Sequence, residues 1–167
     1  MSEKNVNMLS SGILKLDSAE MGRAVTDGTG IVSVGDFVYL YDNAGVPTLG
    51  LASAANAGSD AATYAKRAVG IAVIVTTGTN DIVDYVAISN NVSTLTVYSD
   101  AAETTPAVAA ETGMLIFLSA SNPGKGTTIS PSATGTMSQV LGTWGYTTTG
   151  TVKSASINIE KRPIINP

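Results

Sequence analysis

The feature that most constrains the fold of this chain is a pattern that occurs twice. Residues 35–40 read Gly-Asp-Phe-Val-Tyr-Leu, and residues 113–118 read Gly-Met-Leu-Ile-Phe-Leu. In both, a glycine precedes alternating bulky apolar residues, which is typical of a β-strand entered from a turn. The halves correspond at two further places, residues 68–71 with 140–143 and residues 46–48 with 127–129. The pattern predicts two copies of one β module.

Other segments have the same strand and turn character. Residues 31–41 are dense in β-branched and aromatic residues, and a turn sequence follows them at 42–45. Further strands are expected at residues 68–75, 82–88 and 94–98. Two modules are too few for a solenoid, so we expect an all-β fold, a sandwich or barrel built from two similar β modules, with an extended N-terminal arm.

The predicted boundaries follow from this repeat. Residues 1–29 are expected to form the arm, and residues 30–162 a single all-β domain with halves at 30–90 and 107–160. Residues 163–167 form a C-terminal tail, in which prolines are expected to prevent a continued sheet ladder. The alanine-rich stretch 52–68 is expected to be a loop that includes one helical turn, because small and polar residues interrupt any apolar face.

Composition narrows the classes of function. The chain is 44% hydrophobic, enough for a core without staples, and it contains no cysteine and no histidine. Imidazole-dependent nucleophiles and thiolate metal sites are therefore excluded, and we expect no enzyme, no cofactor and no metal. A hydrolase that uses carboxylates alone stays an alternative.

Charge and hydropathy give two more expectations. The net charge is −4, with Lys and Arg scattered singly along the chain, so no phosphate-binding stripe is expected and no direct binding to nucleic acid. No apolar stretch approaches the roughly 20 residues that span a bilayer, and the N-terminus has no signal-peptide pattern, so membrane insertion is not expected. Only 13% of residues are charged, which suggests that partners cover much of the surface.

Two short motifs resemble a phosphate-binding loop and a cation site, but both are more typical of turns. The sequence Gly-Lys-Gly-Thr at residues 124–127 has glycine where a phosphate-binding loop needs Ser or Thr, so a hairpin turn is expected there. Asp81 and Asp84 lie three residues apart, which on a strand directs their side chains to opposite faces. A solvated turn explains them better than a cation site does.

The candidate partner-binding residues are apolar or aromatic and lie in three places. Trp144 and Tyr146 could stack on a ligand such as a sugar or pack in the core. The remaining candidates belong to the C-terminal tail and to the arm: Ile164, Ile165, Ile13, Leu14 and Leu16.

The paired module resembles those of tailed-phage virion proteins, specifically small capsid decoration (cement) proteins and the related modules of head and tail fibres. The residues that carry the resemblance are 35–40 with 69–72, and 113–118 with 140–142. The second half departs from the pattern at Thr143-Trp144-Gly145, which leaves open whether both halves make the same contact.

The resemblance implies a structural virion protein, often a homotrimer, that binds the major capsid protein. It would be made in the host cytoplasm and would stabilise the shell from its outer surface. The alternative is a head or tail fibre or baseplate protein that recognises a host receptor, with Trp144 and Tyr146 on the binding surface.

Overall fold

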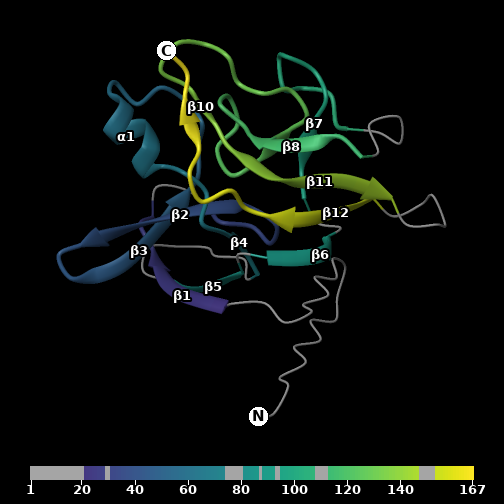
Figure 1. Ribbon diagram of the computed structural model, residues 1–167. Helices are drawn as coiled ribbons and strands as arrows, with labels where there is room; N and C mark the ends of the chain where they lie inside the picture. Colours follow the sequence, from purple (N-terminus) through teal and green to yellow (C-terminus); the bar gives the residue numbers. More distant parts are fainter. Residues whose placement is uncertain are drawn as a thin grey trace.

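The structure is a computed structural model that describes residues 21–28, 31–73, 81–86, 88–92, 95–107, 113–146 and 153–167. In these residues the fold is almost entirely β, which confirms the predicted class. Figure 1 shows the strands of the first half gathered in the lower part of the molecule and most strands of the second half above them.

The first half is a closed barrel. Its strands lie in the order β1-β3-β2-β4-β5, with β1 parallel to β3 and all other neighbours antiparallel. Their bounds are β1 Met21–Thr26, β2 Phe37–Asn43, β3 Val46–Leu51, β4 Gly70–Ala72 and β5 Ile82–Val86. The turn between β2 and β3 forms as predicted, with the Asp42 carboxylate accepting a hydrogen bond from the Gly45 N–H at 2.7 Å.

The second half is a sheet in the order β6-β12-β11-β8-β9-β7. Its strands are β6 Ile88–Val92, β7 Val97–Tyr98, β8 Leu115–Leu118, β9 Gly126–Thr127, β11 Val140–Tyr146 and β12 Lys153–Asn158. β7 is parallel to β9, and the other pairs are antiparallel. The order and directions repeat those of the barrel, with β6 and β7 sharing the position that β1 holds alone.

The two modules also correspond in register. Val38 pairs with Gly70 between β2 and β4, and Ile116 pairs with Gly142 between β8 and β11. A glycine with positive φ precedes each of the equivalent strands β2 and β8. The φ angle is 89° at Gly35 and 88° at Gly113, a conformation that favours glycine.

One predicted correspondence lies elsewhere in the structure. Tyr39 pairs with Gly50 and Phe117 with Thr127, so Thr127 corresponds to Gly50 and not to Val46. The turn between β8 and β9 differs in length from that between β2 and β3. The predicted match of residues 46–48 with 127–129 does not account for this difference, so it is wrong.

The buried apolar residues form two clusters. Inward-facing side chains fill the barrel: Ala24, Val38, Leu49, Ala72 and Val83. Their neighbours on the other face of the barrel, Phe37, Ile71 and Val86, join the core of the second half, which includes Ile116, Leu118 and Leu141. The second cluster therefore contains apolar residues of both halves.

Polar contacts also connect the two halves; we call this region the joint between the modules. The turn after β8 donates from the Gly124 N–H to the Ala52 carbonyl at 2.7 Å and accepts from the Phe37 N–H at 2.8 Å. The next residue, Lys125, forms a salt bridge with Asp36. The fully buried Gln139 side chain exchanges two hydrogen bonds with the Ala68 backbone, at 2.8 and 2.9 Å.

The stretch 52–68 contains the one helix among the described residues, α1 Asp60–Ala65. Ser59 caps it by accepting from the Ala62 N–H, which satisfies a backbone donor that the helix leaves unpaired. A loop with a short helix agrees with the prediction.

The chain ends differ from the predicted boundaries. Part of the predicted arm, Met21–Thr26, is β1, because its residues pair with both β5 and β3 and close the barrel. Residues 1–20, with Ile13, Leu14 and Leu16, lie outside the described residues. The tail does form a ladder between its prolines, since β13 Ile164–Ile165 pairs with β10 Met137–Ser138.

Candidate assembly surface

The C-terminal segment is the best-defined candidate for contact with a partner. Asn166 fixes its end, because its side-chain amide donates to the Pro131 carbonyl at 2.8 Å and to the Thr136 hydroxyl at 3.0 Å. Its backbone also bonds to Thr136 and Gly135. The segment is therefore held on the body of the protein.

The two isoleucines of β13 have different surroundings. Ile165 packs against the large core cluster, whereas Ile164 is 67% exposed. Single exposed apolar side chains are common on protein surfaces, so what distinguishes Ile164 is that hydrogen bonds fix the segment that carries it. Of the two predicted tail residues, Ile164 is the one that a partner could reach.

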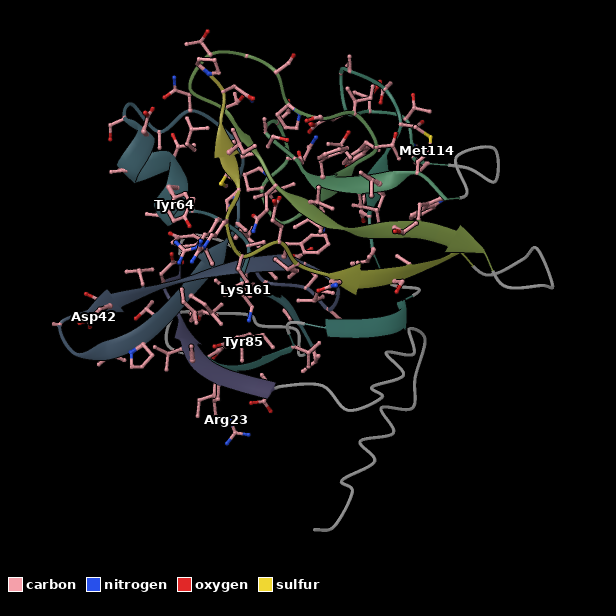
Figure 2. The ribbon with its side chains drawn as sticks, in the orientation of Figure 1. Arg23, Asp42, Tyr64, Tyr85, Met114 and Lys161 are labelled. Atoms are coloured by element: carbon pink, nitrogen blue, oxygen red, sulfur yellow. The ribbon has the colours of Figure 1, made fainter. Side chains whose placement is uncertain are left out.

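Other exposed apolar residues lie elsewhere on the surface. Met114 and Leu115 precede and begin β8, and Figure 2 shows Met114 at the opposite end of the second half from α1. The remaining large ones among the described residues are Ile31, Val46, Ile82 and Ile129.

Trp144 is a core residue. It is 3% exposed and belongs to the large buried cluster with Ile116 and Leu141. The prediction that Trp144 lies on the binding surface of a fibre protein is therefore wrong, because a ligand cannot stack on a ring that the core covers. Tyr146 ends β11, and its side chain lies outside the described residues.

The acidic residues considered in the sequence do not come together. Asp81 precedes β5. Asp84 accepts from the Arg23 guanidinium at 2.6 and 3.1 Å, and this hydrogen bonding lowers the pKa of the carboxyl below its usual value. In the part of the chain described, no group of three or more metal-ligating side chains could hold an ion, and no helix is long and apolar enough to cross a membrane.

A small cleft of about 210 Å³ lies beside Glu103. Glu103 has φ 53° and is buried, and its carboxylate accepts from the Ser119 hydroxyl, the Ser121 N–H and the Asn122 amide. At the mouth, Asp100 has a lowered pKa because its carboxylate accepts from the backbone N–H of Thr105 and from Thr104. These carboxylates hold loops together, and the volume is below the roughly 300 Å³ usual for a ligand pocket.

The candidate surface was only partly predictable. The sequence singled out Ile164. The hydrogen bond from Tyr64 of α1 to the Lys161 carbonyl joins residues 97 positions apart, and local sequence patterns do not predict such a contact. No family model matches the chain, and no curated protein is significantly similar to it in sequence.

Proposed function

We propose that this protein is a structural virion protein that decorates the outer surface of a phage capsid. It binds the major capsid protein as a homotrimer and stabilises the shell, and it performs no catalysis. The observation that carries the proposal is the exposed Ile164 on the C-terminal strand β13. Backbone pairing with β10 and side-chain hydrogen bonds of Asn166 hold this strand on the double β module. Many identical weak contacts on a symmetric shell add up to a large collective stabilisation.

The low charge and the joined cores support the same proposal. The two modules share one core, and hydrogen bonds at Gly124 and Gln139 and the Asp36–Lys125 salt bridge connect them further. A body connected in this way can hold neighbouring shell subunits together.

The test is co-sedimentation of the purified protein with expanded capsid shells, together with its mass from light scattering. We expect saturable binding, a trimeric mass, and weaker binding for Ile164→Ser. Val46→Ser, at the first residue of β3, is the matched control for loss of an exposed apolar side chain. Absence of shell binding by the full chain would refute the proposal.

The arm is tested separately by deletion. The deletion has to end before Met21, because β1 closes the barrel, and removal of residues 1–29 would unfold the first half. If the arm binds the shell, deletion of residues 1–20 should abolish attachment and leave the circular dichroism spectrum unchanged. Stoichiometric binding by this truncated protein would assign attachment to the folded body.

A further inference from the structure

We propose that the face formed by Tyr64, Lys66, Arg67, Lys161 and Arg162 binds a carboxylate-rich segment of a partner protein. Within the proposed function, on which this assignment of the partner rests, the segment belongs to the shell protein. The exposed Ile164 follows Arg162 by two residues in the same C-terminal segment. We call these five residues the basic face.

The structure brings together two basic pairs that are distant in the sequence. The Tyr64 hydroxyl donates to the Lys161 carbonyl at 3.4 Å, and α1 lies against β13. Arg67 lies over the Tyr64 ring, with its guanidinium carbon 4.5 Å from the ring centroid, and donates to the Tyr64 carbonyl at 3.3 Å. Figure 2 shows Tyr64 on α1 with Lys161 below it. Tyr64 therefore links Arg67 with the backbone of Lys161, and Lys66 and Arg162 are the sequence neighbours of these two residues.

The cations of the basic face form no ion pair with a described acidic residue. The salt bridges of the described residues are Arg23–Asp84 and Lys125–Asp36. The nearest acids in the sequence are Glu160, whose carboxylate accepts from the Val140 N–H at 3.2 Å, and Asp60, which lies one helical turn before Tyr64. Lys66, Lys161 and Arg162 are exposed, so they can reach an external anion.

The charge of the rest of the chain makes this concentration of cations unusual. The whole chain carries −4, so the residues outside the basic face carry −8 once its four cations are set aside. A long polyanion such as duplex DNA would extend beyond the face and meet this negative surface. A short acidic protein segment avoids that repulsion.

The chemistry of the face also suits carboxylates. Arginine offers a planar fork of donors that matches a carboxylate, and the contact with the Tyr64 ring and the hydrogen bond to the Tyr64 carbonyl hold the Arg67 guanidinium in place. Lysine adds point charges with freely rotating donors. Ile164, two residues after Arg162, adds an apolar anchor of the kind found beside polar rims in protein interfaces.

The direct test uses a fluorescent 15-residue polyglutamate peptide and fluorescence anisotropy at 20 to 300 mM salt. We expect the full chain to bind it with an affinity that falls as salt rises. The variant K66Q/R67Q/K161Q/R162Q should bind at least tenfold more weakly. Arg23→Gln is the control, since Arg23 is an exposed cation at the far end of the barrel, and it should change the affinity less than twofold.

A second variant guards against a loss of structure, because Arg67 packs on Tyr64. K66Q/K161Q/R162Q keeps that contact and should still lose most of the binding. Absence of peptide binding by the full chain overturns the proposal. So does binding by the two variants that is as tight as binding by the full chain. Tighter binding to a 15-base-pair DNA duplex than to the peptide also overturns it.

The same variants on capsid shells separate this inference from the proposed function. If the full chain and the four-residue variant bind shells equally well, the basic face is not the attachment face, although the decoration function stands. If the full chain binds polyglutamate and not shells, the decoration function fails and the basic face stands.

Discussion

Tyr85 and Trp144 lie at equivalent cross-strand pairs of the two modules, but on opposite strands of those pairs. In the barrel, Tyr85 of β5 pairs with Ala72 of β4. In the second sheet, Trp144 of β11 pairs with Ala155 of β12. Each pair combines one large aromatic residue with one alanine. The backbone pairing is therefore the same in both modules, but the aromatic residue comes from β5 in the barrel and from β11 in the second sheet.

The barrel makes room for Tyr85 with glycine. A Cβ atom at Gly22 would lie 2.1 Å from Cζ of Tyr85, and one at Gly70 would lie 2.5 Å from its Cδ2. We expect Gly22→Ala to lower the free energy of unfolding by about 1 kcal/mol, the low end of the cost of overpacking, because the contacted atoms are the end of a half-buried ring that can shift. In a Tyr85→Leu background the same substitution should cost much less. Urea denaturation of the four proteins measures the coupling, and additive effects would contradict the proposed contact.

The burial of Trp144 gives a prediction for stability. Trp144→Ala should lower the free energy of unfolding by about 3 to 5 kcal/mol, because it removes a large buried ring from the shared core. Ile164→Ala, at an exposed side chain, should leave the unfolding midpoint nearly unchanged. Thermal denaturation followed by circular dichroism tests both, and a Trp144→Ala protein of normal stability would contradict the packing.

Local patterns predicted the strands well. The runs around Gly35 and Gly113 carry the alternation and the entry glycine that the structure uses, and pairing at Gly70 and Gly142 confirms the repeat. The order of turns and strands follows from residues that are near one another in the sequence.

What the sequence could not supply depends on distant contacts. The local sequence of Met21–Thr26 does not predict that these residues pair with two other strands. The basic residues were interpreted as scattered singly, although Lys66 adjoins Arg67 and Lys161 adjoins Arg162. The hydrogen bond from Tyr64 to Lys161 shows that the two segments that carry these pairs lie next to each other.

Tyr85 also predicts how stability depends on alkaline pH. Burial raises the pKa of its phenol above the ordinary value of 10.0. The folded protein therefore keeps the proton above about pH 10, where the unfolded chain loses it, and stability falls as the pH rises through this range. Tyr85→Phe should flatten that fall between pH 9 and 11, measured by urea denaturation at each pH. Since burial raises the pKa of Tyr39 as well, Tyr39→Phe should remove a further part of the slope.

The joint between the modules gives the last prediction. Lys125 neutralises Asp36, whose side chain is only 5% exposed, and Asp36 also accepts from the Ser33 N–H at 2.9 Å. Lys125→Met leaves a buried carboxylate without its cation, so we expect a loss of about 3 kcal/mol in the free energy of unfolding. Arg23→Met breaks a salt bridge whose cation is 70% exposed, and it should have little effect because solvent screens that pair. The double variant Lys125→Met/Asp36→Asn should recover most of the loss, since it removes the stranded charge and keeps an acceptor for the Ser33 N–H. Equal effects of Lys125→Met and Arg23→Met in urea denaturation would show that the Asp36–Lys125 salt bridge does not hold the modules together.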